Sequence, residues 1–230
     1  MTVNAAVQPG NTLFNNSASF PYTITSSGGN NIGGSGGISK NNSGSVTLAG
    51  GANTYTGVTA VNAGTLSVGA LANGGAPSDI GAASSAPANL VLNGSTLQYT
   101  GSTAGTDRGA TLGASGATVD VPSSGIVLTD SGVITGSGSL TKIGLGTLAL
   151  SGASTFSGGV ALNEGELDIN NGGSSSANSA IGTGTLTIGA GTVIDNSSGS
   201  DVTLLPNNAQ VWNGSFLFAG FGNNLNWCSG

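Results

Sequence analysis

The strongest candidate for chemistry in the sequence is a group of three acidic residues, Glu164, Glu166 and Asp168. Side chains alternate along an extended strand, so we expect the three carboxylates on one side, opposite Leu167 and Ile169. Two carboxylates roughly 5 to 10 Å apart in a groove can cleave glycosidic bonds, and carboxylate oxygens also bind Ca²⁺. The group is therefore the candidate catalytic site of a polysaccharide hydrolase or lyase and a candidate Ca²⁺ site. The alternative is a solvated acidic face.

Other catalytic chemistry is excluded by composition. The chain has no histidine and a single cysteine, Cys228, which rules out a Ser-His-Asp triad, His- or thiolate-based zinc sites and an internal disulfide. Lys40 and Lys142 recur at one position of a repeat, which favours a structural role over Ser-Lys catalysis. The adjacent Asp107 and Arg108 predict a local ion pair in a loop. We therefore favour a protein without catalysis and without a cofactor.

The charge of the chain excludes further classes of function. The formal net charge is -6 with only 3 Lys and Arg residues, whereas binding to nucleic acid needs clustered basic residues. No apolar run reaches the roughly 18 to 20 residues of a membrane-spanning helix. Met1 leads directly into the strand-like residues 2–7 rather than into a signal peptide. We therefore expect a segment of a longer protein, with no nucleic-acid partner and no membrane span.

The elements that must position these residues are short strands joined by tight turns. The chain contains 43 Gly but 37% hydrophobic residues, and apolar residues alternate with small polar ones, as in 45–48, 65–68 and 147–150. Glycine and asparagine, which tolerate positive φ, follow most of these stretches. In this pattern Asp120 and Asp130, on either side of Pro122, are expected in turns or facing outward.

The sequence also repeats itself over a long period. Residues 38–68 match residues 140–169: Lys40 and Lys142 are 102 positions apart, and Tyr55 and Phe156 are 101 apart. The similarity extends over about 38–99 and 140–195. Such a repeat favours a solenoid, in which each coil packs on its neighbours. We expect a single-stranded parallel β-helix of about ten coils over residues 1–230, without separate domains; the alternative is a β-sandwich repeat.

The repeated residues resemble a known family. The pattern Leu140-Thr-Lys-Ile-Gly-Leu-Gly-Thr-Leu-Ala-Leu-Ser-Gly, followed by Thr155-Phe-Ser-Gly and Asn163-Glu-Gly-Glu-Leu, is similar to the autotransporter-associated β-strand repeat, also called the passenger-associated transport repeat. Residues 38–68 resemble it too. The resemblance implies a right-handed parallel β-helix in a secreted or surface-displayed bacterial passenger, which serves as a scaffold or stalk, in adhesion, or in self-association. It implies no catalytic residues.

Two groups of aromatic residues offer contacts with partners. Tyr55 could stack on a sugar, but Phe156 takes the equivalent position, so packing against a corner is the favoured interpretation. The ends of a solenoid expose strand edges that pair readily. We therefore expect self-association through the ends of the solenoid or through an aromatic C-terminal region, with polysaccharide as an alternative partner. The region comprises Phe216, Phe218, Phe221 and Trp227.

Overall fold

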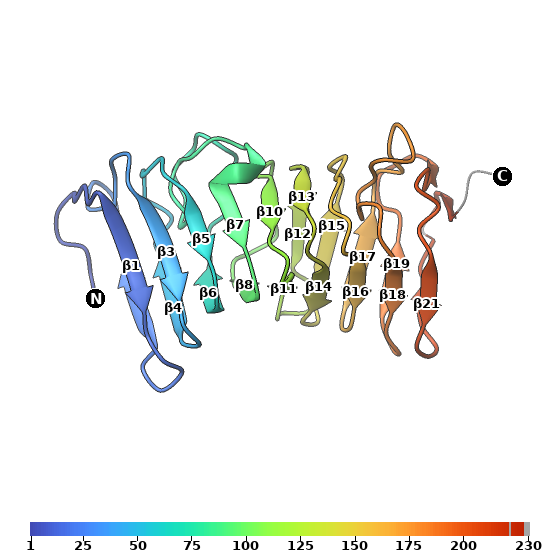
Figure 1. Cartoon of the computed structure of the whole chain (residues 1–230), viewed down its shortest axis with the longest axis horizontal. Coiled ribbons are helices and arrows are strands. Elements are labelled where there is room, and N and C mark those ends of the chain that lie inside the picture. Colours follow the sequence, from blue (N-terminus) through green and yellow to red (C-terminus); the bar gives the residue numbers. More distant parts are fainter. Residues whose placement is uncertain (221, 228–230) are drawn as a thin grey trace.

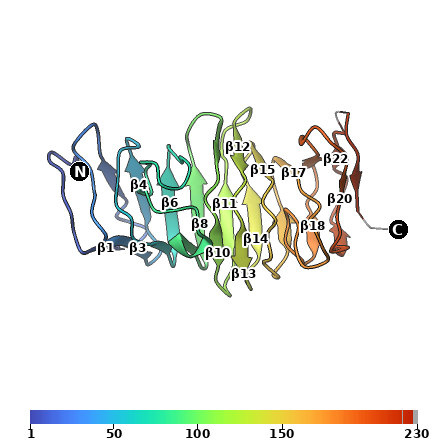
Figure 2. The same cartoon turned by 90° about the horizontal axis from the view of Figure 1, so that it is seen from above.

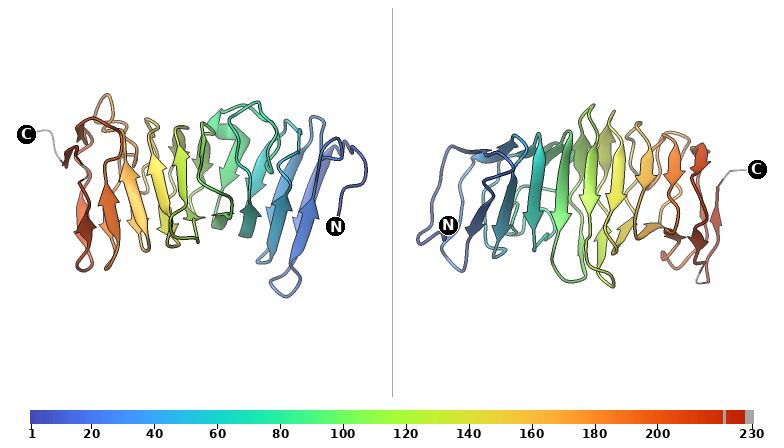
Figure 3. Two further views of the ribbon diagram at one scale, coloured as in Figure 1. Left: turned by 180° about the vertical axis from the view of Figure 1, so that it is seen from behind. Right: turned by 90° about the horizontal axis from the view of Figure 1, so that it is seen from below.

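The computed structural model describes residues 1–220 and 222–227, which stack as a rod of short parallel strands. Residues 11–15 lie near one end of the rod and residues 210–212 near the other (Figure 1). Views from above, below and behind show the strands lying across its long axis (Figures 2 and 3). The parallel β-helix predicted from the sequence is therefore confirmed.

One sheet runs the length of the rod, and we call it the long sheet. It has nine strands, one from each coil, so the solenoid has about nine coils rather than ten. The strands, in spatial order, are β2 (Tyr22–Thr25), β4 (Ser45–Ala49), β6 (Gly64–Val68), β8 (Ser95–Tyr99), β11 (Ala117–Asp120), β14 (Leu140–Ile143), β16 (Val160–Leu162), β18 (Leu186–Ile188) and β21 (Gln210–Trp212).

Two six-stranded sheets form other faces of the rod. The N-terminal sheet contains β1 (Asn11–Asn15), β3 (Gly37–Asn41), β5 (Thr59–Val61), β7 (Leu90–Leu92), β10 (Ala110–Leu112) and β13 (Ile134–Gly136). The C-terminal sheet contains β9 (Ala104–Thr106), β12 (Val127–Asp130), β15 (Thr147–Leu150), β17 (Glu166–Ile169), β19 (Val193–Asp195) and β22 (Leu217–Phe218). A two-stranded sheet, β20 (Val202–Thr203) with β23 (Leu225–Asn226), and a 3₁₀ turn, η1 (Pro87–Asn89), complete the described elements.

The pairing of strands excludes the β-sandwich alternative. Every pairing between the named strands is parallel, whereas sandwiches of this kind are built from antiparallel sheets. Successive register partners in the long sheet are 20 residues apart from Val46 to Leu66 and 31 apart from Leu66 to Leu97. The longer coil accommodates a loop at residues 69–89 between β6 and β7.

The core fills the interior with columns of apolar side chains that lie in register on successive coils. Each fully buried Leu, Ile or Val contributes about 1.5 to 3 kcal/mol relative to an exposed one. The column on the long sheet consists of Val46, Leu66, Leu97, Val119, the charged Lys142, Leu162, Ile188 and Trp212, so that seven of its eight residues are apolar. Seven of these eight residues are at most 9% exposed, and the last, Trp212, is 61% exposed at the end of the rod.

The two repeat copies lie on different faces of the rod. Strands β3 to β6 of the first copy alternate between the N-terminal sheet and the long sheet, while β14 to β17 of the second alternate between the long sheet and the C-terminal sheet. The second copy is thus displaced by one face around the solenoid. The offset of 101 to 102 residues therefore does not correspond to a whole number of coils.

Candidate functional site

The acidic residues predicted from the sequence are held by separate donors. The Glu164 carboxylate accepts a hydrogen bond from the Gly144 backbone N–H (2.9 Å), and the Glu166 carboxylate accepts one from the Thr147 hydroxyl (3.0 Å). Both donors belong to the preceding coil. Glu164 lies in the corner before β17 and is exposed, because the chain turns at Gly165, whose φ is +68°.

Asp168 faces the following coil instead. Its Oδ2 accepts a hydrogen bond from the Ser197 hydroxyl (2.6 Å), and its strand partner in register is Asp195 on β19. Both aspartates are buried, at 6% and 5% exposed. The pKa of Asp168 is raised to about 6, chiefly by burial and also by the nearby Glu166 and Asp195 carboxylates, against the lowering effect of the Ser197 hydrogen bond.

The three predicted acidic residues therefore do not face a common site. Glu164 and Glu166 bind donors of the coil before them, and Asp168 binds a donor of the coil after it. Within residues 1–220 and 222–227, no group of three or more His, Cys, Asp or Glu side chains is placed to hold a metal ion. The sequence could not identify Asp195 as the neighbour of Asp168, because their separation of 27 positions does not correspond to a fixed coil length.

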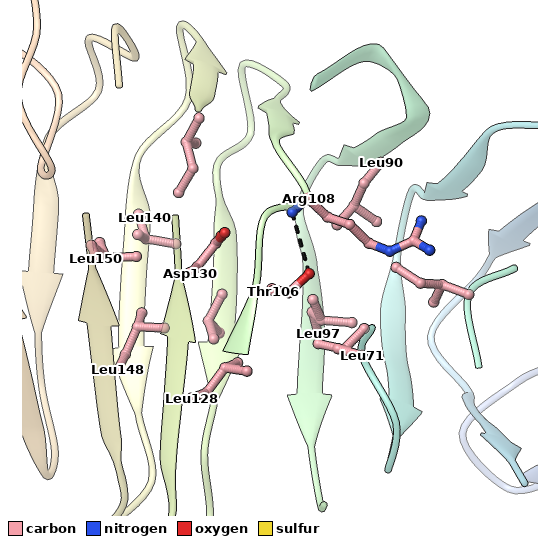
Figure 4. A pocket seen from close by; sticks show the side chains of 13 residues that line it. Leu71, Leu90, Leu97, Thr106, Arg108, Leu128, Asp130, Leu140, Leu148 and Leu150 are labelled. Atoms are coloured by element: carbon pink, nitrogen blue, oxygen red, sulfur yellow. Dashed lines mark hydrogen bonds between the residues drawn. The ribbon is translucent and has the colours of Figure 1, made fainter. Parts of the chain in front are cut away.

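Asp130 lies on the inward face of β12, and the expectation that it sits in a turn or faces outward was wrong. Its register partners are Thr106 and Leu150, whose side chains are buried. With Leu128 and Leu148 it lines an internal cavity of about 40 Å³ (Figure 4). The carboxyl is closely surrounded by protein although the residue as a whole is only partly covered, and this burial raises its pKa to about 7.

The inward carboxyl of Asp130 predicts stability that depends on pH. The pKa of the Asp130 carboxyl is about 7 in the folded chain and 3.8 in the unfolded chain. The stability that the protonated carboxyl contributes is therefore fully present below about pH 4, and it is lost as the pH rises through about 7. The shift corresponds to about 3 kcal/mol after allowance for the partial exposure of Asp130. We expect Asp130→Asn to match the wild type at pH 4 and to be more stable than it by about that amount at pH 8.

Urea denaturation followed by circular dichroism at both pH values measures this difference. The Gly132 N–H, which donates to Asp130 Oδ1 at 2.8 Å, can still donate to the asparagine oxygen. Thr129→Ala, on the outward face of the same strand, should keep the pH dependence of the wild type. If the free energies of unfolding of the wild type and Asp130→Asn differed by the same amount at pH 4 and pH 8, the pKa of the Asp130 carboxyl would not be raised by folding.

The two repeat lysines are structural, as the sequence predicts. Lys142 is fully buried, and its ammonium donates to the carbonyl oxygens of Ile143 (2.9 Å), Gly144 (2.7 Å) and Glu164 (3.2 Å). Burial lowers its pKa to about 8. Lys40 makes the equivalent contacts with the carbonyls of residues 41, 42 and 63. Each lysine therefore joins the corner of its own coil to the corner of the next.

Arg108 and Asp107 hold the loop at residues 69–89 and do not form the ion pair expected between them. Asp107 accepts a hydrogen bond from Gly74 N–H (2.6 Å). The Arg108 guanidinium, 5% exposed, donates to five backbone carbonyls of that loop at 2.7 to 3.3 Å. These carbonyls belong to Ala72, Asn73, Ala76, Gly81 and Ala83. The sequence carried no signal for this arrangement.

Tyr55 packs in the core, which is the interpretation that the sequence favours over stacking on a sugar. It is 1% exposed and Phe156 is 0% exposed. The Tyr55 hydroxyl lies 2.7 Å from the Thr59 hydroxyl, which satisfies its polar end. Each ring packs against a glycine of the next coil, Gly81 or Gly182, where a Cβ would lie about 2.9 Å from the ring.

Both ends of the rod expose apolar side chains. At the C-terminal end, Trp212 is 61% exposed and Phe218 is 39% exposed, although they lie in register above the fully buried Ile188 and Ile194. Edge-to-face contacts join Trp212 to Phe216 (5.3 Å) and Phe218 to Trp227 (6.0 Å). Phe221 and Cys228 lie outside the described residues. At the N-terminal end, Met1, Val3, Val7, Phe14, Ile24 and Ile32 line an apolar groove of about 300 Å³.

Comparison with known proteins agrees with this architecture. The passenger-associated-transport-repeat family matches residues 38–68 and 140–169. These are the two segments with the lysine-bridged corners, so the chain carries two passenger-associated transport repeats, and the resemblance seen in the sequence is confirmed.

One curated relative is the adhesin BmaC autotransporter of Brucella suis biovar 1 (strain 1330). It is 45% identical over 127 residues, which cover 55% of this chain and 4% of the adhesin. This similarity supports a secreted or surface-displayed location. No solved structure gives a significant match. The described residues contain no helix of the length and apolar character that crossing a membrane requires.

Proposed function

We propose that residues 1–230 act as one continuous stalk segment of a surface-displayed adhesive protein, without separate domains, and that copies associate end to end. The observation that carries the stalk is the uninterrupted long sheet. The apolar side chains that this 230-residue segment exposes at both ends support the association of its copies. The adhesin relative supports a role in adhesion. Polysaccharide cleavage gains no support, because Glu164, Glu166 and Asp168 face different coils and Tyr55 is buried.

End-to-end association fits the direction of the strands. All strands of the long sheet are parallel, so β21 of one copy can pair with the N-terminal edge of a second copy in the orientation that the sheet already has. The protruding rings of Trp212 and Phe218 would enter the apolar groove lined by Val3 and Phe14. A contact between unlike ends does not close on itself and therefore gives linear arrays.

We expect the mean mass of the chain in light scattering to rise with concentration. The double variant Trp212→Glu/Phe218→Glu should stay monomeric at the concentrations where the wild type associates, because it places charge in the apolar contact. Leu145→Glu is the matched control, since Leu145 is 67% exposed on the side of the rod. A wild type that remains monomeric, or a double variant that associates equally well, would contradict the proposal.

A further inference from the structure

Asp168 and Asp195 form a buried pair of carboxylates on neighbouring coils. They are register partners on the parallel strands β17 and β19, so both side chains leave the same face of the C-terminal sheet from backbones about 4.8 Å apart. Leu167 and Ile194, their neighbours in the two strands, point into the core and are 0% exposed. The pair therefore lies on the outer face of the sheet, and both residues are nonetheless at most 6% exposed.

One buried oxygen of this pair has no hydrogen-bond partner among residues 1–220 and 222–227. Asp168 Oδ2 accepts the Ser197 hydroxyl, but the buried Asp168 Oδ1 accepts no hydrogen bond from these residues. Asp195 Oδ1 accepts from the backbone N–H groups of Asn196 (2.7 Å) and Gly220 (3.0 Å). A buried carboxylate oxygen without a donor costs free energy unless a cation or a proton compensates it.

No basic side chain of the protein supplies that compensation. The sequence contains three Lys and Arg residues in all. Lys40 and Lys142 donate to the carbonyls of their corners, and Arg108 donates to the carbonyls of the loop at residues 69–89. Two carboxylates one strand spacing apart are therefore buried together without a basic partner from the chain.

The repeat itself does not require the acids. Position 168 corresponds to Ser67 in the first copy, which occupies the same place on its strand with a neutral hydroxyl. The fold therefore forms at this position without a carboxylate. The acidic pair is a feature added to the scaffold at one coil boundary.

We propose that Asp168 and Asp195 bind a divalent cation, Ca²⁺, between the coils of β17 and β19. Hard carboxylate oxygens are the preferred ligands of Ca²⁺, which tolerates irregular geometry and completes its shell with hydroxyls, carbonyls and water. Asp168 Oδ1 supplies a ligand oxygen, and Asp195 supplies a second carboxylate one strand away. The ion joins two successive coils and replaces the missing counter-charge.

Calorimetric titration of the chelator-treated chain with CaCl₂ tests the proposal. We expect binding of one Ca²⁺ with a Kd of about 10⁻⁴ to 10⁻³ M, the range of extracellular modules. At Ca²⁺ roughly 100-fold above Kd, the Tm should rise by about 5 °C or more. Mg²⁺ should give a smaller rise, because it loses its hydration water reluctantly.

Asp168→Asn and Asp195→Asn should each weaken Ca²⁺ binding by at least about tenfold. Glu164→Gln is the matched control and should bind as the wild type does, because Glu164 faces the preceding coil. Circular dichroism establishes that each variant folds. The absence of Ca²⁺ heat and of a Tm shift in the wild type would overturn the proposal, whatever the variants do. Equal Ca²⁺ stabilisation of wild type and folded Asp168→Asn would overturn it too.

Discussion

Arg108→Ala is expected to lower the free energy of unfolding by about 5 kcal/mol. The guanidinium donates to five carbonyls of the loop at residues 69–89, including those of Ala72 and Gly81. Removing it leaves these carbonyls partly buried without donors and opens a space beside the internal cavity that Arg108 lines (Figure 4). Denaturant unfolding measures the loss.

The loop should also lose its order locally in this variant. We expect faster hydrogen exchange at amides such as Gly75 N–H, which donates to the Ala83 carbonyl at 2.9 Å. Arg108→Lys should suffer most of the same loss, because one ammonium cannot reproduce the fork of the guanidinium. Ser124→Ala, at an exposed position, should change stability by less than about 0.5 kcal/mol. An Arg108→Ala variant within about 1 kcal/mol of the wild type would show that water replaces the guanidinium.

Lys142→Ala is expected to cost a similar amount, about 5 kcal/mol. The substitution removes a fully buried side chain and leaves the carbonyls of Ile143, Gly144 and Glu164 without their donor. Lys142→Met should lose less stability than Lys142→Ala, because the methionine side chain fills the space and buries no charge. The carbonyls still lack their donor in this variant, so part of the loss remains. The same unfolding experiment measures both variants.

The first repeat copy provides an internal comparison for this prediction. Lys40→Met should match Lys142→Met, since Lys40 donates to three equivalent carbonyls. Thr141→Ala, on the outward side of β14, should change stability by less than about 0.5 kcal/mol. Unequal losses at Lys40 and Lys142 would show that the two corners are not energetically equivalent.

The acidic candidate site could be predicted only in part. The sequence marks the segment from Glu164 to Asp168 as one in which the two copies differ in charge. It treated the segment as one extended strand, but the positive φ of Gly165 places Glu164 in a corner before β17 begins. Asp195 could not be associated with Asp168, since the distance along the chain between neighbouring coils varies with each loop.

Asp130 illustrates a second limit of sequence patterns. Its proximity to Pro122 predicted a turn or an outward position, because charged residues are rarely placed in a core. The register with Thr106 and Leu150 turns it inward beside the internal cavity. A strand of four residues carries too few alternating positions for the sequence to decide which face is buried.

The sequence by itself determined the short strands and the repeated corners and favoured a parallel β-helix, and the parallel strand pairing then excluded the β-sandwich. Alternation sets the strands, glycine and asparagine set the turns, and Lys40 and Lys142 recur because each corner has carbonyls to satisfy. The tertiary structure alone decided that the second copy lies one face further around the rod, and that Asp168 meets Asp195. The physical reason is that local geometry repeats with the sequence, whereas neighbours across coils depend on the summed length of every intervening loop.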